Sequence, residues 1–100
     1  MTNLHQNRRE EFLNRTKNEL KGDSVLLALW HDGKGDWDAA HAQVDQLPGK
    51  DAARIHAYLH RKEGDLWNAD YWYKRADETR PDMTLDQEWE FLLERFDDVR

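Results

Sequence analysis

The hydrophobic residues of this chain recur at intervals of three and four, the spacing that places them on one face of an α-helix. In the last such segment Leu85, Trp89, Leu92, Phe96 and Val99 follow one another in alternating steps of four and three. A sustained alternation of hydrophobic and polar residues, which is typical of a half-buried strand, does not occur. The pattern therefore predicts an all-α protein.

Capping and turn residues divide the chain into about six helices. Asp23 or Ser24, and then Asp36, can cap the helices that follow them, and Thr84 with Gln87 forms a capping box before the last helix. Glycines and prolines end the segments. The second segment, which contains SVLLALW, is hydrophobic nearly all round and is expected to be central. The predicted helices span residues 4–21, 24–32, 36–47, 51–63, 65–77 and 84–98.

The hydrophobic seam of the last helix has two interpretations. It covers only about two heptads, whereas a coiled coil is recognised over three or four. We expect this helix to fold back and seal the domain. The alternative is a homodimer formed through the C-terminal helix.

Two segments of the chain repeat each other. ALWHDGKGDWDAAH (28–41) aligns with AYLHRKEGDLWNAD (57–70) at a constant offset of 29 residues, as from Gly35 to Gly64. The identities mark the same events in both copies: a helix end, a glycine break, an aspartate cap and small packing residues. The identical pairs are Ala28 and Ala57, His31 and His60, Gly35 and Gly64, Asp36 and Asp65, and Ala40 and Ala69.

The second copy continues as GDLWNADYWYKRADETRP, which resembles the second helix of a tetratricopeptide repeat. In the first copy Val44 replaces the large aromatic residue, and the period of 29 is shorter than that family's 34 residues. The matching positions are the opening Gly64, the small residues Ala69 and Ala76, the aromatic Tyr73 and the terminating Pro81.

The resemblance covers roughly residues 24–81. It implies two central tetratricopeptide-like hairpins between N- and C-terminal capping helices and, by analogy with such arrays, a surface for a protein or peptide partner. The whole chain is also similar to short bacterial proteins with an HAYLHRxEGD and YWY arrangement, a likeness that implies no function.

Composition narrows the classes of function. One hundred residues suit a single domain, and eleven aromatic residues, five of them tryptophan, can supply its core. A net charge of −6 disfavours a nucleic-acid binder, and without cysteine there are no disulfides or thiolate metal sites. The longest hydrophobic run, VLLALW at 25–30, is too short for a secretory signal or a membrane span. We therefore expect a cytoplasmic protein with no membrane partner.

Histidines form the first candidate site. His56 and His60 lie four residues apart with Glu63 three further on, so a helix over 51–63 places all three on one face. With His41 from the neighbouring helix, and also His31, they could hold Zn²⁺ or a similar divalent ion.

The repeat favours a different interpretation of the same histidines. His31 and His60 each stand in the last turn of a predicted helix, where an imidazole can interact with free carbonyls or with a following cap such as Asp65. We favour this structural role over metal binding and over acid–base or ligand chemistry. His56 has Leu27 at its equivalent position, so it is the first histidine to test for chemistry.

Aromatic residues form the second candidate site. Trp67 and Tyr71 fall nearly opposite the hydrophobic face of the helix predicted over 65–77. Either this helix is sandwiched between two neighbours, which we expect, or the pair forms an exposed patch. An exposed patch flanked by Lys74 and Arg75 has the composition of an interaction hot spot.

The leading hypothesis is a non-enzymatic interaction module that binds a protein, a peptide or a second copy of itself. The only serine, Ser24, is placed as a helix cap, and GKGD at 33–36 lacks the spacing of a phosphate loop. No cofactor is expected under this hypothesis. The rival is a small metal- or ligand-binding protein, conceivably an enzyme, that uses the histidines and Glu63.

Overall fold

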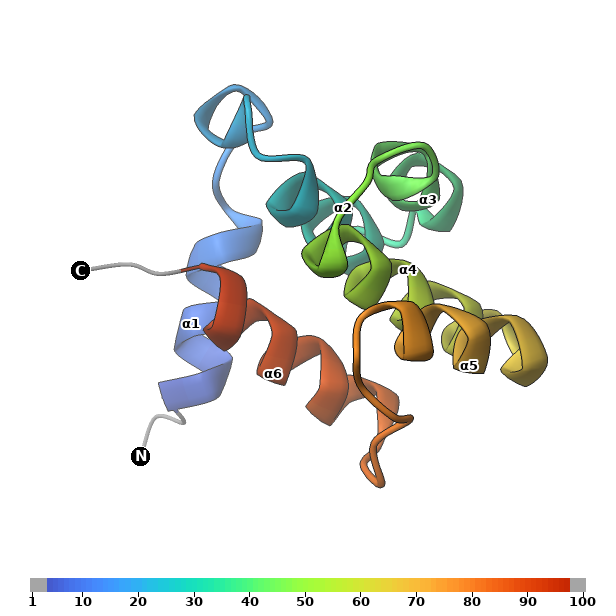
Figure 1. Ribbon diagram of the computed structural model, residues 1–100. Coiled ribbons are helices and arrows are strands. Elements are labelled where there is room, and N and C mark those ends of the chain that lie inside the picture. Colours follow the sequence, from blue (N-terminus) through green and yellow to red (C-terminus); the bar gives the residue numbers. More distant parts are fainter. Residues whose placement is uncertain (1–3, 98–100) are drawn as a thin grey trace.

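The computed structural model describes residues 4–97, with side chains described from Arg8 onward. This part of the chain contains six α-helices and one short 3-10 helix, joined by turns (Figure 1). No strand occurs in that part, so the all-α prediction is confirmed. None of its helices is long and apolar enough to cross a bilayer. The elements are α1 (Leu4–Leu13), η1 (Asn18–Leu20), α2 (Ser24–Gly33), α3 (Trp37–Val44), α4 (Lys50–Glu63), α5 (Leu66–Arg75) and α6 (Leu85–Phe96).

Four of the helices, α2, α3, α5 and α6, begin directly after residues that the sequence marks as caps. The side chains of Asp23, Asp36 and Asp65 each accept a hydrogen bond, 3.0–3.2 Å long, from the backbone amide three residues on. Thr84 and Gln87 form the predicted capping box, with reciprocal bonds of 3.1 and 2.9 Å. These bonds satisfy backbone amides that have no partner within the first helical turn.

Two predicted boundaries are wrong. The sequence predicts a third helix that reaches residue 47, but α3 ends at Val44. The sequence predicts a continuous helix over 4–21, but α1 ends at Leu13 and a separate turn, η1, follows. The reason is a second reciprocal pair: the Glu19 amide donates to Thr16 Oγ1 (3.2 Å), and the Thr16 amide donates to Glu19 Oε1 (3.0 Å). This T-x-x-E pair caps a new turn, as the equivalent pair does before α6.

The repeated residues adopt the same local structure in both copies. Gly35 and Gly64 have left-handed φ values of 87° and 91°, a conformation that favours glycine. The amide of the next residue, Asp36 or Asp65, donates to the carbonyl of His31 (2.9 Å) or His60 (3.0 Å). α2 therefore turns into α3 as α4 turns into α5, and these two pairs make the most extensive contacts between elements. The alanines that allow close approach are completely buried: Ala28, Ala40, Ala57 and Ala69.

The terminal helices lie together rather than at opposite ends of the hairpins. α1 and α6 contact each other and α2, and α6 also contacts α4 (Figure 1). Trp89 packs edge-to-face against Phe12, with 5.9 Å between ring centroids, and its indole N–H donates to the Leu29 carbonyl (3.1 Å). The seam of α6 thus faces the core of its own chain, as predicted for a helix that folds back. Its last predicted member, Val99, lies outside the described residues.

α6 also carries a buried charge into the core. Glu88 Oε2 accepts hydrogen bonds from Arg54 Nη1 (2.7 Å) and Tyr73 Oη (2.6 Å), and Oε1 accepts one from Arg61 Nη1 (2.6 Å). The Glu88 and Arg54 side chains are almost completely buried. This Glu88 network, formed by Glu88, Arg54, Arg61 and Tyr73, joins α6 to both helices of the second hairpin. Sequence analysis did not identify it.

Substitution of Glu88 by Ala is expected to lower the free energy of unfolding by about 3–5 kcal/mol, because it removes the buried carboxylate bound to Arg54 Nη1 and leaves the buried guanidinium with Glu78, at Nε, as its remaining carboxylate partner. Urea denaturation at pH 7 measures this change. The control is Glu94→Ala, which removes an exposed carboxylate from the same helix and should change stability by less than about 0.5 kcal/mol. Equal stabilities of the two variants would contradict this role for Glu88.

Candidate functional site

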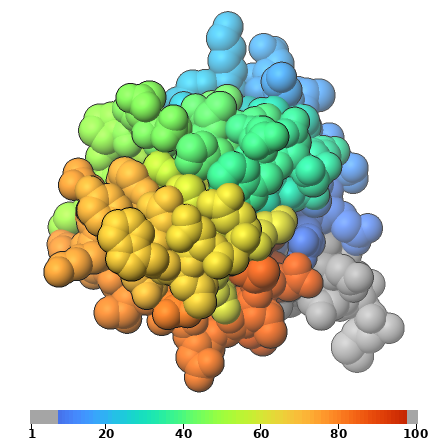
Figure 2. Space-filling view, turned by 90° about the vertical axis from the view of Figure 1, so that its right-hand side faces the viewer, coloured from blue at the N-terminus to red at the C-terminus, as the bar shows by residue number. Residues whose placement is uncertain are grey.

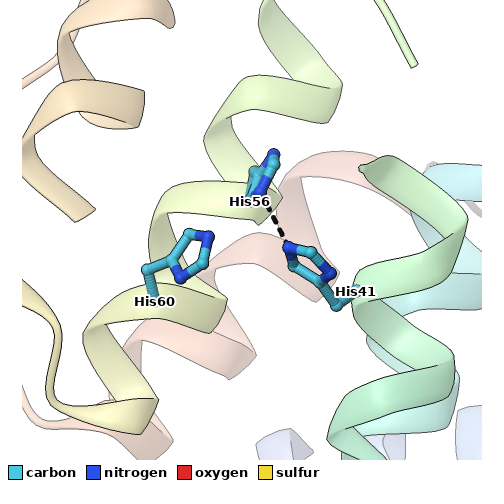
Figure 3. A group of neighbouring side chains, drawn as sticks. All are labelled: His41, His56 and His60. Atoms are coloured by element: carbon cyan, nitrogen blue, oxygen red, sulfur yellow. Dashed lines mark hydrogen bonds between the residues drawn. The ribbon is translucent and has the colours of Figure 1, made fainter. Parts of the chain in front are cut away.

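Three histidines from two helices meet between α3 and α4 (Figure 3). His56 and His60 stand one turn apart on α4 with their rings stacked, 4.8 Å between centroids. His41 reaches across from α3, and its Nε2 lies 3.0 Å from Nε2 of His56. One ring nitrogen from each histidine lies within 4.8 Å of those of the other two. The structure therefore brings together three of the imidazoles that the sequence predicts as possible metal ligands. We call His41, His56 and His60 the three-histidine cluster.

Two tryptophans hold the rings of this cluster. Trp37 stacks on His41 with 4.9 Å between centroids and 9° between planes, and Trp72 stacks on His56 at 4.0 Å and 16°. The Trp37 indole is itself anchored, because its N–H donates to the Leu59 carbonyl (2.8 Å). The imidazoles are thus held in defined orientations by aromatic surfaces on two sides.

Glu63 fixes the orientation of the third ring. His60 Nδ1 lies 2.5 Å from Glu63 Oε1. An ionised carboxylate can only accept, so Nδ1 carries a proton, and in the neutral imidazole Nε2 then keeps its lone pair. Figure 3 shows one ring nitrogen of His60 pointing toward the other two histidines. A carboxylate behind a histidine with its second nitrogen free is a common arrangement around metal-binding histidines. Glu63 therefore acts as a positioning residue.

Burial disfavours the charged form of His56, which is only 3% exposed. Burial, with smaller contributions from the His41 and His60 rings, lowers the pKa of His56 from its ordinary 6.5 to about 4, and Asp45 opposes this shift. His56 Nδ1 has no hydrogen-bond partner among the described residues. At neutral pH His56 is thus a neutral imidazole, the form that binds metal ions.

One predicted ligand does not join the cluster. His31 lies in α2 beside Trp30, with 5.2 Å between ring centroids, and it is not part of the three-histidine cluster. Its repeat counterpart His60 pairs with Glu63, but the equivalent of Glu63 in the first copy is Lys34, which cannot accept a hydrogen bond. The inclusion of His31 in a metal site is therefore wrong.

The predicted hydrogen bond between His60 and Asp65, the cap of the next helix, does not form. The Asp65 carboxylate accepts from the Asn68 amide (3.2 Å), and the imidazole bonds Glu63 instead. His60, Glu63 and Asp65 do come within 4.8 Å of one another, but both carboxylates are exposed and already have these partners.

The aromatic candidates lie on the surface. Trp67 is 82% exposed and Tyr71 is 47% exposed, so the expected sandwich is wrong for these two side chains. α5 buries its other face, including Ala69 and Tyr73, against α4. Among the described residues no helix covers the outer face of α5, because α6 turns back onto α2 and α4. The Arg75 guanidinium lies 5.8 Å from the Tyr71 ring centroid.

Sequence reasoning missed one acidic neighbour of the cluster. Asp45 Oδ1 lies 3.8 Å from His41 Nε2. The spacing of four residues between His41 and Asp45 could have indicated this contact, because it places the two side chains one helical turn apart, with Asp45 directly after the end of α3.

Comparison of the chain with protein-family models, with curated proteins and with solved structures gives no match. The assignment of a role to the cluster therefore depends on its geometry.

Acidification is expected to destabilise the metal-free protein as the pH falls from about 6.5 toward 4. The His56 pKa is lower in the folded state than in the unfolded chain, so the unfolded state binds an additional proton in this window. The contribution of His56 to stability is complete above pH 6.5 and is lost as the pH falls toward 4.

Urea unfolding between pH 7.5 and 4 in the presence of a chelator measures this effect. His56→Gln should reduce the pH slope by up to about one proton relative to the unsubstituted protein. Identical slopes for the two proteins would show that His56 does not contribute.

Proposed function

We propose that this protein binds a divalent transition-metal ion, such as Zn²⁺, through His41, His56 and His60. The observation that carries the proposal is the convergence of three imidazole nitrogens from α3 and α4 within 4.8 Å. Imidazole is a preferred ligand of Zn²⁺, Cu²⁺, Ni²⁺ and iron.

The spacing of the ligand atoms supports this proposal. Two nitrogens bound to a tetrahedral zinc ion by bonds of about 2.1 Å are about 3.4 Å apart. His41 Nε2 and His56 Nε2 are separated by 3.0 Å, and the third nitrogen lies within 4.8 Å of both. Small rotations of the rings are therefore sufficient to surround an ion.

The state of the rings also supports metal binding. Glu63 accepts from His60 Nδ1, so the neutral form of this ring has its lone pair on Nε2, and burial keeps His56 neutral. Stacking on Trp37 and Trp72 reduces the conformational entropy that His41 and His56 lose on binding. The competing interpretation is that the three rings only pack against one another, and metal titration separates the two.

Isothermal titration of untagged, chelator-treated protein with ZnCl₂ is expected to give one bound ion per chain. At a free zinc concentration of about 100 times Kd, the Tm should rise by roughly 10 °C. The double variant His56→Ala/His60→Ala should weaken binding by at least about 100-fold, because loss of a residue that only supports a ligand already costs 10- to 100-fold.

The matched control is His31→Ala, which removes the repeat counterpart of His60 but leaves the cluster intact. It should keep one bound ion. No stoichiometric zinc in the unsubstituted protein, or equal loss in the control, would contradict the proposal and favour simple packing.

We propose as a second function that the outer face of α5 binds a protein or peptide partner. Trp67 and Tyr71 stand one turn apart and are exposed, and Lys74 and Arg75 flank them. Figure 2 shows the side of the molecule on which α5, in yellow to light orange, faces the viewer below the green segment that contains α3. An exposed tryptophan and tyrosine beside basic residues have the composition of a binding hot spot.

The double variant Trp67→Ala/Tyr71→Ala is expected to abolish partner binding and to change the free energy of unfolding by less than about 1 kcal/mol, because Trp67 lies largely in solvent and Tyr71 is about half exposed. Affinity capture from a lysate and sedimentation velocity measure binding of other proteins and of a second copy. The control is Phe91→Ala, which removes a 44% exposed aromatic residue from α6.

The two variants also separate α5 from the C-terminal helix as an interface. A dimer dissociated by Phe91→Ala but not by the double variant would contradict the α5 proposal and favour association through α6. Unfolding of the double variant would contradict a purely surface role for Trp67 and Tyr71.

A further inference from the structure

The three-histidine cluster by itself does not complete the coordination of a divalent ion. Three neutral imidazoles provide three ligands and no negative charge, whereas a closed tetrahedral site has four ligands. The surroundings are largely buried, and a buried charge without compensation is unfavourable. A site that holds the ion firmly would therefore include an anionic group at the fourth position.

Asp45 is the carboxylate best placed to supply that group. It follows α3 directly, one turn after His41, and its Oδ1 lies 3.8 Å from His41 Nε2. Ligand atoms on one tetrahedral ion are about 3.4 Å apart. Asp45 is not one of the groups that lie within 4.8 Å of one another, so its side chain has to turn toward His56 and His60 to bind the same ion.

The side chain of Asp45 has the freedom to make this movement. It is 46% exposed, and its Oδ2 accepts one long hydrogen bond of 3.4 Å from the Gln46 amide group. It also lines a pocket of about 350 Å³ between the α3–α4 turn and α5, together with Ala53 and Trp72. Trp72 is the residue that stacks on His56, so the pocket borders the cluster.

The other carboxylates near the cluster have different roles. Glu63 contacts Nδ1 of His60, on the side of the ring opposite the free Nε2. Asp65 caps α5 through the Asn68 amide. Neither can take the fourth position without giving up its present hydrogen bond.

We propose that Asp45 is the fourth ligand, so that the ion is held by His41, His56, His60 and Asp45 in a closed four-coordinate site. This inference rests on the proposed metal binding and specifies its kind. A closed site holds its ion for structure, storage or sensing, whereas a catalytic zinc site keeps one position open for water or substrate.

Cobalt(II) is the probe, because its visible absorption is strong in four-coordinate tetrahedral sites and weak when water raises the coordination number. The unsubstituted protein should give the strong spectrum and should not respond to sodium azide, a small anion that occupies open positions. Asp45→Asn should weaken Co²⁺ binding by about 10-fold or more, lower the absorption and make it respond to azide. The control Glu94→Gln, which removes one exposed negative charge from α6, should behave as the unsubstituted protein.

The outcomes separate the two proposals. Unchanged affinity and spectrum in Asp45→Asn, or an azide response in the unsubstituted protein, would overturn the role of Asp45 while metal binding stands. Failure of the unsubstituted protein to bind Co²⁺ or Zn²⁺ would overturn the metal site itself, and this inference with it.

Discussion

The fold depends on satisfying the polar groups that α4 carries into the interior. Nine consecutive residues of this helix, 52–60, are buried, and they include an arginine, two histidines and a tyrosine. Each polar side chain that loses water must find a partner, since an unpaired buried group costs more than a hydrogen bond contributes. Neighbouring helices supply the partners of Arg54, Tyr58 and His56 Nε2, whereas His60 pairs with Glu63 of α4 itself.

Each face of α4 meets a different neighbour in this way. Toward α6, Arg54 bonds Glu88. Toward α2, the Tyr58 hydroxyl donates to the buried carboxylate of Asp32 (2.8 Å), which also accepts from Lys62 Nζ (2.8 Å). Toward α3, the imidazoles of α4 meet His41. Hydrophobic burial drives the packing, but these contacts specify which face of α4 each helix covers.

Features that depend on residues close together in the chain, such as helix caps, could be predicted from the sequence. Features that depend on contacts between distant residues, such as the burial of a particular side chain, could not. The caps at Asp36, Asp65 and Thr84 are local, and all three are confirmed. The approach of His41 was also predictable, because α3 and α4 follow one another in the chain and successive hairpins of a helical repeat stack. Glu88 was not, since in a chain with 36% charged residues nothing distinguishes it from an exposed glutamate on the same helix. The exposure of Trp67 likewise depends on where α6 docks, a contact over a long distance in sequence.

The location of the histidines between two hairpins has a mechanical consequence. His41 belongs to the first hairpin, and His56 and His60 belong to the second. The hairpins are connected by the turn at residues 45–49, where Gly49 has a φ of 104°. Contacts across such a junction set the angle between successive repeats, and in stacked helical hairpins small changes of that angle alter the curvature of the whole surface. The contacts of His41 with the imidazoles of α4 therefore help to set the angle between the two hairpins, together with α6, which contacts both α2 and α4.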